Sequence, residues 1–187
     1  MNISGIKICV SGTAETSHCG KDAYERAKEL GREVVRQNAL LLTGATAGFP
    51  YWATIGAKEL NGSTVGISPA GSEVEHIHAY KLPTSNLDLI IYTGFGFSGR
   101  NITLVHSSDA IIVGCGQSGA MNEFVFAYET GKPIGILEGS WASDEVIKML
   151  IEKGGKPTNN IVFDKDPKRL VEKVINLVVA SKKSLYR

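Results

Sequence analysis

Three glycines with the spacing G-x-G-x-x-G, at Gly114, Gly116 and Gly119, lie between an apolar run and a segment of helical periodicity. Glycine lets a backbone turn sharply and approach a ligand closely, and the first N–H groups of a helix have no partner within it. Those N–H groups and the helix dipole attract phosphate. On this segment alone a purely structural turn is an equal alternative, because any tight strand-to-helix turn favours glycine.

Two charged residues are placed to do chemistry near this loop. Arg100 stands at the start of the preceding helical segment, where its planar fork can hold a phosphate or stabilise negative charge. Glu123 lies one turn into the helix after the glycines, where a carboxylate can activate water or stabilise positive charge on a sugar ring. The plainer alternatives are a surface ion pair for Arg100 and a dipole-favoured first-turn residue for Glu123. We interpret the two as a catalytic pair.

Other residues give weaker signals. Phe95 and Phe97 either offer a flat face to a base or pterin or pack into the core. We interpret His76 and His78 as residues of a solvated loop and not as metal ligands, since no H-E-x-x-H spacing accompanies them. Cys115 has no evident histidine partner and is not interpreted as a nucleophile. We therefore expect no metal and no resident cofactor.

The elements that would position these residues alternate along the chain. Short apolar runs predict strands at 6–10, 39–42, 64–68, 87–92, 110–113, 134–137 and 161–163, with helices at 21–37, 50–60, 99–107, 120–130, 143–153 and 167–180. The polar segment 69–86 is predicted to be a long loop. Continuous apolar strands between helices indicate a parallel sheet covered on both faces. We predict an α/β fold with a single doubly wound parallel sheet of about seven strands, Rossmann-like, in one nucleotide-binding domain spanning 1–187.

Ligands of such sheets bind beyond the carboxyl ends of the strands, where the strand order reverses. With an order of 3-2-1-4-5, that crevice would lie between the first and fourth strands. The loops there are rich in Gly, Ser and Thr, and their predicted ligand- and phosphate-binding residues are Ser11, Gly12, Thr13, Gly44, Gly48, Gly114, Gly116, Gln117, Ser118, Gly119 and Ala120. The dinucleotide fingerprint is missing from the first strand-to-helix turn, and the Walker sequence is absent, which argues against NAD-dependent and P-loop NTPase functions.

Composition limits which binding partners and which cellular compartment we expect for this protein. The formal net charge is +1, with acidic and basic residues interspersed, which predicts neither nucleic-acid nor membrane binding. Cysteines stand only at positions 9, 19 and 115, an odd number without C-x-x-C spacing, so a reducing cytoplasm fits better than a disulfide framework. The first residues lack the pattern of a signal peptide, and no run is long enough for a membrane span. We expect a cytoplasmic protein.

These residues resemble the Lonely Guy (LOG) family and its relatives, among them lysine decarboxylase-like and molybdenum-cofactor carrier proteins. The family motif P-G-G-x-G-T-x-x-E is similar to the run Gly116–Glu123, which keeps the first Gly, the later Gly and the Glu. The family's upstream Arg matches Arg100, its second-strand glycine loop resembles residues 43–48, and its first loop resembles residues 11–13. The likeness runs from about residue 6 to 137.

The resemblance implies a Rossmann-like fold, commonly homodimeric, and a nucleotide-derived small-molecule ligand. Its enzymes cleave nucleoside 5′-monophosphates into base and ribose 5-phosphate, which would make Arg100 and Glu123 catalytic. Gln117 in place of Gly, Ala120 in place of the phosphate-binding Thr, and Asn101 in place of Lys depart from the pattern. Two functions therefore stay open: a phosphoribohydrolase of nucleoside monophosphates, or a non-catalytic binder, carrier or sensor of a nucleotide-like ligand such as molybdenum cofactor. A homodimer built by helices of the 98–130 region is expected.

Overall fold

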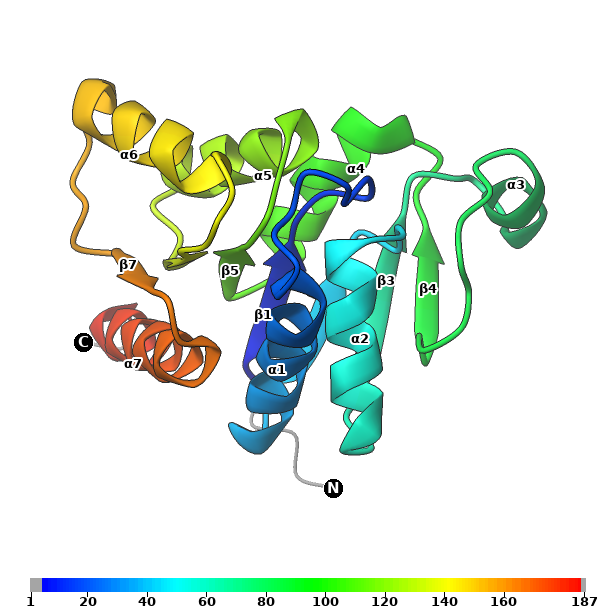
Figure 1. Cartoon of the computed structure of the whole chain (residues 1–187), viewed down its shortest axis with the longest axis horizontal. Coiled ribbons are helices and arrows are strands. Elements are labelled where there is room, and N and C mark those ends of the chain that lie inside the picture. The colour runs from blue at the N-terminus through cyan, green and yellow to red at the C-terminus, as the bar shows by residue number, and fades with distance from the viewer. Residues whose placement is uncertain (1–4, 186–187) are drawn as a thin grey trace.

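A computed structural model describes residues 5–185, in which seven parallel strands form one sheet. The spatial order is β4-β3-β2-β1-β5-β6-β7 (Figure 1). The strands are β1 (Lys7–Ser11), β2 (Leu40–Thr43), β3 (Thr64–Ser68), β4 (Leu89–Tyr92), β5 (Ala110–Val113), β6 (Ile134–Leu137) and β7 (Ile161–Asp164). The interior strand β5 is buried on both faces, as its unbroken apolar run predicts. The predicted α/β doubly wound sheet is confirmed.

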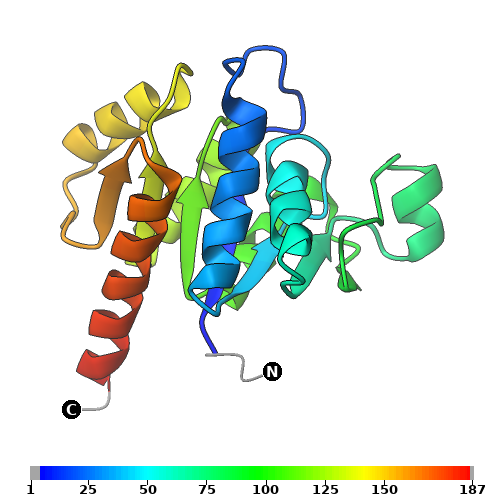
Figure 2. The ribbon, with the colours of Figure 1, turned by 60° about the horizontal axis from the view of Figure 1, so that its bottom comes forward.

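Helices cover both faces of the sheet. They are α1 (Ala23–Arg36), α2 (Phe49–Glu59), α3 (Glu73–His78), α4 (Gly96–Ser107), α5 (Ser118–Glu129), α6 (Ser143–Gly154) and α7 (Pro167–Leu185). Helices α1, α2 and α7 pack on one face, side by side in Figure 2, around a core that includes Leu30 and Val174. Helices α4, α5 and α6 supply Leu104, Phe124 and Ile147 to the core of the other face.

The predicted strand order is wrong at one point. The strand beside β1 is β5, whereas the fourth strand lies at the edge, paired with β3. The chain steps outward from β1 to β4 before α4 returns it across the sheet, so the reversal of order falls between β1 and β5. The apolar run of β4 gave no sign of this, although Leu89 and Ile91 are half exposed, as an edge strand allows.

The segment 69–86, predicted as a loop, contains the short helix α3, whose first turn is capped by Ser72 accepting from the Glu75 N–H. His76 is fully buried, contrary to the solvated loop expected, and its ring bonds to Ser68 Oγ (2.8 Å) and Pro83 O (3.1 Å). One ring nitrogen thus fastens this segment to the end of β3, and the other ties α3 to the later part of the same segment. His76 has a structural role here.

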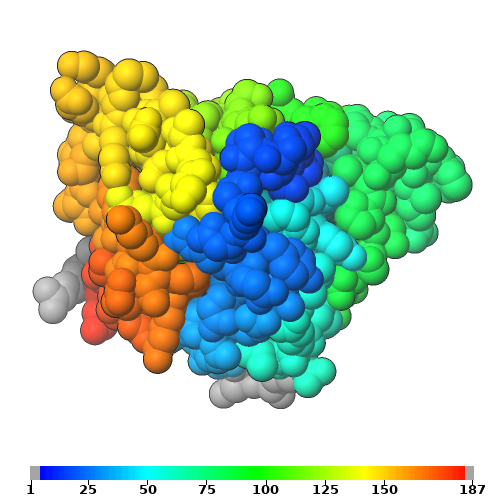
Figure 3. Space-filling model, in the orientation of Figure 1, coloured from blue at the N-terminus to red at the C-terminus, as the bar shows by residue number. Residues whose placement is uncertain are grey.

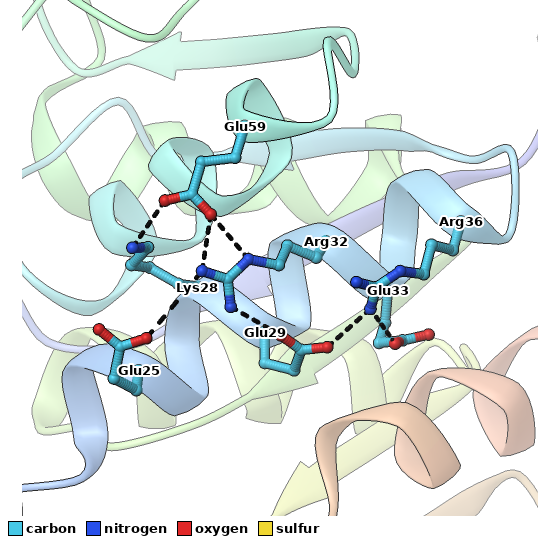
Figure 4. Close-up of polar contacts among 7 residues, drawn as sticks. All are labelled: Glu25, Lys28, Glu29, Arg32, Glu33, Arg36 and Glu59. Carbon is cyan, nitrogen blue, oxygen red and sulfur yellow. Dashed lines mark hydrogen bonds and ion pairs between the residues drawn. The ribbon is translucent and has the colours of Figure 1, made fainter.

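Helices α1 and α2 approach each other closely through two glycines. A Cβ added at Gly31 would lie 1.9 Å from the Ala53 carbonyl oxygen, and one at Gly56 would lie 1.9 Å from that of Lys28. An ion-pair network runs along the exposed edge of the contact, where Glu59 of α2 binds Lys28 and Arg32 (each 2.6 Å) of α1 (Figure 4). Exposed pairs contribute little singly, so the glycines set the helix separation.

We expect Gly56→Ala to lower the free energy of unfolding by about 2–3 kcal/mol, because the methyl group must push one backbone away from another. The matched control is Gly119→Ala, also in a helix, where an added Cβ would have no atom within 4 Å. Urea denaturation of the two variants checks this. Equal unfolding midpoints for Gly56→Ala and the control would contradict the close contact.

Asp164 joins β7 to α7. Its carboxylate accepts from Arg169 Nη2 (2.9 Å) and Lys173 Nζ (2.9 Å) and from the Asp166 N–H (2.8 Å). The hydrogen bonds from Arg169 and then Lys173 hold the pKa of Asp164 well below its usual range. A carboxyl with a lowered folded-state pKa stabilises the fold above its unfolded pKa and loses that stabilisation as pH falls.

Asp164→Asn is expected to cost about 1–2 kcal/mol at neutral pH, since both cationic partners are half exposed and solvent screens them. The cost should shrink below about pH 4, because Asp164 becomes protonated in the unfolded wild-type chain while it stays ionised in the folded one. Chemical denaturation of both proteins across acidic pH measures the difference. A cost that stays constant with pH would contradict the ion-pair explanation.

Candidate functional site

A cleft of about 570 Å³ opens at the carboxyl ends of β1, β2 and β5, where the strand order reverses. It lies where the sequence placed it, beside β1, although β5 and not the fourth strand forms its other side. It is lined by Val10, Gly12, Thr13, Ala14, Glu15, Gly44, Thr46, Pro50, Phe97, Ser98, Arg100, Asn101, Gln117, Ser118, Gly119, Ala120, Asn122 and Glu123.

Three helix N-termini meet this cleft. Helix α5 begins at Ser118 after Gln117, α4 begins at Gly96 after Phe95, and α2 begins at Phe49 after Gly48. At these three starts no side chain caps the helix by a hydrogen bond. The positive dipole ends of three helices therefore converge on one space, although the Phe49 and Gly96 N–H groups already donate to the carbonyl oxygens of Thr13 and Pro69. This arrangement suits an anionic ligand such as phosphate.

Arg100 and Glu123 form a buried ion pair at the bottom of the cleft. Arg100 Nη1 donates to Glu123 Oε1 (3.0 Å), and Ser11 Oγ donates to the other carboxylate oxygen. Turned so that its nitrogen faces acceptors, the Asn101 amide also donates to Oε1 (2.9 Å). Arg100 and Glu123 are only 4% and 6% exposed. Both carboxylate oxygens thus have donors from the protein itself.

Burial and ion pairing shift the pKa values of Arg100 and Glu123 in opposite directions. Burial raises the pKa of Glu123, while Arg100 and the Ser11 hydroxyl favour its carboxylate form. Burial likewise lowers the pKa of Arg100, opposed by Glu123. Arg100 Nε is buried without a hydrogen-bond partner among the described residues. Glu123 therefore relies on Arg100 and Ser11 to favour its carboxylate form, and Arg100 relies on Glu123 to offset the cost of burying its charge.

Gly44 makes room for this arginine. A Cβ at Gly44 would lie 1.9 Å from Arg100 Nη1 and 2.5 Å from its Cζ. Any larger residue at the end of β2 would displace the guanidinium. The glycine that the sequence indicated as a ligand contact therefore also positions Arg100.

Most of the residues predicted from the sequence lie on the cleft. Lining it are Gly12, Thr13, Gly44, Arg100, Gln117, Ser118, Gly119, Ala120 and Glu123. Four others lie behind the wall: Ser11, Gly48, Gly114 and Gly116. Ser11 holds Glu123, and Gly48, with a φ of 73°, begins α2. A Cβ at Gly114 would lie 2.2 Å from the Phe49 ring. Ser11, Gly48 and Gly114 therefore support the cleft without lining it.

Sequence reasoning missed several cleft residues. Ala14 and Glu15 continue the loop after β1, and Asn101 directly follows Arg100. Extending each predicted loop by two or three residues would have found them. Phe97 lines the cleft and is half exposed, and its ring meets Tyr80 edge-on at 5.3 Å. Phe95 is more exposed and does not line it, so neither ring is buried in the core.

The cysteines correct another expectation. Cys19 and Cys115, which are 96 residues apart in the sequence, form a disulfide. The third cysteine, Cys9, is a free thiol buried in the sheet. Cys115 also has a histidine neighbour that the sequence did not reveal, since His18 Nε2 lies 3.5 Å from its sulfur.

Within residues 5–185, no helix is long and apolar enough to cross a bilayer.

Comparison with known proteins decides the family. Residues 5–171 match the SLOG cluster4 family, and this span includes every element that lines the cleft. The chain belongs to the SLOG cluster4 family. An uncharacterized protein of Archaeoglobus fulgidus is 28% identical over 133 residues, covering 71% of this chain and 82% of that protein.

Solved structures share the fold of this chain. The molybdenum cofactor binding protein of Rippkaea orientalis is 27% identical with a TM-score of 0.75, over 92% of this chain and 97% of that one. The molybdenum cofactor carrier protein of Chlamydomonas reinhardtii, 24% identical with a TM-score of 0.72, covers 94% of this chain and 99% of its own. The predicted resemblance to the LOG and carrier-like proteins is thereby confirmed at the level of family and fold.

Proposed function

We propose that this protein binds and carries a phosphate-bearing, nucleotide-like small molecule in the cleft, with molybdenum cofactor as the leading candidate. The observation that carries the proposal is the convergence of three helix N-termini, none with a side-chain cap, on one cleft lined by the glycine loop. The likeness to the Rippkaea orientalis cofactor-binding protein supports the choice of ligand.

The cleft offers separate recognition for the two ends of such a ligand. The backbone around Ser118 and Gly119 would receive the phosphate, because nothing lies within 4 Å of a Cβ at Gly119 and the space is open. Phe97 would face the ring system of the ligand from the opposite helix. The volume of about 570 Å³ falls in the range usual for small-molecule sites.

The arrangement of Glu123 favours a carrier over a hydrolase. A general base or sugar-stabilising carboxylate must present an available lone pair to the substrate. Both oxygens of Glu123 already accept hydrogen bonds, from Arg100 and from Ser11, which leaves fewer of its lone pairs for a substrate. Ala120 further lacks the hydroxyl that the LOG motif supplies for phosphate. The pair is better suited to holding the cleft floor rigid than to turnover.

The phosphoribohydrolase remains the second candidate. Arg100 and Glu123 do line the cleft, side by side, as a catalytic pair would. A ligand that draws Arg100 onto its phosphate would release one oxygen of Glu123 toward the sugar. Release of free base from a nucleoside 5′-monophosphate would support this function.

The carrier proposal is tested with molybdenum cofactor released from a purified molybdoenzyme. Mixed with this protein, the cofactor is expected to co-elute in gel filtration and to survive longer than free cofactor in reconstitution of an apo-molybdoenzyme. The control is Gly119→Val, which should neither co-elute with the cofactor nor prolong its survival. Loss of cofactor at the same rate with wild type, variant and no protein would refute the carrier proposal.

We also infer a homodimer through the face formed by α4 and α5. These helices pack together and leave Ile102 and Val125 partly exposed, while the neighbouring edge strand exposes Leu89 and Ile91. Such apolar area on one face favours a partner surface. We expect a dimer mass in sedimentation, and a monomer mass for Ile102→Glu. A wild-type mass of one chain at all concentrations would contradict this.

A further inference from the structure

Three side chains with metal-binding atoms gather at the rim of the cleft. They are His18 and Cys19, from the loop between β1 and α1, and Cys115, directly after β5; their ligand atoms lie within 4.8 Å of one another. His18 Nε2 is 3.5 Å from Cys115 Sγ and 4.0 Å from Cys19 Sγ. Figure 3 shows the loop after β1, in blue, exposed on the molecular surface. No other such group occurs within residues 5–185.

The second ring nitrogen of His18, Nδ1, has a carboxylate neighbour, as in many metal sites. It lies 3.3 Å from Glu15 Oε2. A histidine that binds a metal through one ring nitrogen usually donates the other N–H to a carboxylate, which fixes the tautomer and the ring orientation. The Gln117 amide nitrogen also lies 3.4 Å from Nδ1. When Nδ1 carries the ring proton and donates it to Glu15, the Nε2 lone pair faces both sulfurs.

We propose that His18, Cys19 and Cys115, in the dithiol form of the protein, bind one Zn²⁺ ion. Two thiolates and one imidazole are a ligand set typical of zinc, and three protein ligands leave one tetrahedral position for water. The site lies next to the cleft, because Glu15 and Gln117, which contact His18, line the cleft wall. The Cα atoms of the two cysteines are 5.9 Å apart, so both thiolates can reach one ion with little backbone movement.

The zinc site and the disulfide use the same two sulfurs and exclude each other. In the structure the sulfurs are joined. A dithiol reductant would supply two electrons and two protons, giving two thiols here and becoming a disulfide itself. Zn²⁺ then displaces the two thiol protons and binds both sulfurs and His18 Nε2. The site therefore exists only after reduction, and it stands apart from the proposed carrier function.

The site is coupled to the loop that frames the cleft. The Thr13 N–H donates to the Cys115 carbonyl oxygen (2.8 Å), and the Phe49 N–H donates to the Thr13 carbonyl (2.9 Å). The cluster thus joins the loop after β1 to the glycine loop after β5. Zinc would replace the disulfide as the link between these two loops.

The test is a zinc titration of the full chain against a chromophoric chelator, after reduction with a dithiol and its removal without air. The reduced wild type is expected to bind one Zn²⁺ per chain, and the oxidised wild type none. Cys19→Ser and His18→Ala should each lose at least ~100-fold in affinity, and Glu15→Gln roughly 10-fold. Cys9→Ala and His78→Ala, which lie outside the cluster, are matched controls expected to bind like the wild type.

Circular dichroism checks that each variant is folded, and Co²⁺ as a second probe reports thiolate ligation directly. Cobalt bound to the reduced wild type should show thiolate-to-metal charge-transfer absorption, which weakens in Cys19→Ser. Failure of the reduced chain to bind zinc stoichiometrically would overturn the proposal. So would equal zinc affinity in the wild type and Cys19→Ser, or in the reduced and oxidised chains.

Discussion

Gly119→Val is expected to remove binding of phosphate-bearing ligands while the protein stays folded. Gly119 lies in the first turn of α5 and lines the cleft, and a Cβ there has no atom within 4 Å. The valine side chain would therefore occupy the space into which the helix N–H groups point, without disturbing the core. We expect an affinity loss of at least ~100-fold, or about 2.7 kcal/mol, measured by calorimetric titration.

Gly119→Ala provides the graded control for this prediction. Its single methyl group should reduce affinity less than valine does, and neither variant should unfold at a lower urea concentration than the wild type. A folded Gly119→Val protein with unchanged affinity for nucleotides would remove the start of α5 from the ligand site.

The second large effect is expected at the buried ion pair. Arg100→Met should lower the free energy of unfolding by ~3–5 kcal/mol, because it leaves the Glu123 carboxylate buried without its cation. Adding Glu123→Gln removes that uncompensated charge, so the double variant should recover part of the loss. Urea denaturation of the four proteins in this cycle measures the coupling. Strictly additive losses would contradict an interdependent pair.

The same variants separate binding from catalysis. If Arg100 contacts the ligand phosphate, Arg100→Met should bind 5′-monophosphates more weakly but unphosphorylated nucleosides as the wild type does. If Glu123 is a catalytic carboxylate, Glu123→Gln should lose ~10²–10⁴-fold in rate with little change in binding. The carrier account expects no rate to lose. It expects Glu123→Gln to act on stability instead.

Much of the fold could be predicted because its signals are local. Buried strands such as β5 are unbroken apolar runs, and the helices between them carry helical periodicity. The place of the fourth strand could not be predicted, since β4 is as apolar in sequence as a central strand. Its position at the edge depends on where α4 can return across the sheet, which is a long-range property.

The candidate site, like the fold, could be predicted only in part. The glycine loop before α5 and the pairing of Arg100 with Glu123 followed from loops that a parallel sheet brings together at one edge. The disulfide between Cys19 and Cys115 and the nearby His18 did not, because these residues meet only through the β1–β5 pairing. Gly44 was predicted as a ligand contact and lines the cleft, but its further role of leaving space for Arg100 could not be predicted from the sequence.

The most direct test of the central claim is to measure binding and turnover in one sample. Wild-type protein is titrated with nucleoside 5′-monophosphates, with the matching nucleosides and with single-stranded DNA, and free base is followed by chromatography. The account predicts binding that requires the phosphate, no binding of nucleosides or DNA, and no release of base. Binding of nucleosides as tight as that of their monophosphates, or steady release of base, would contradict it.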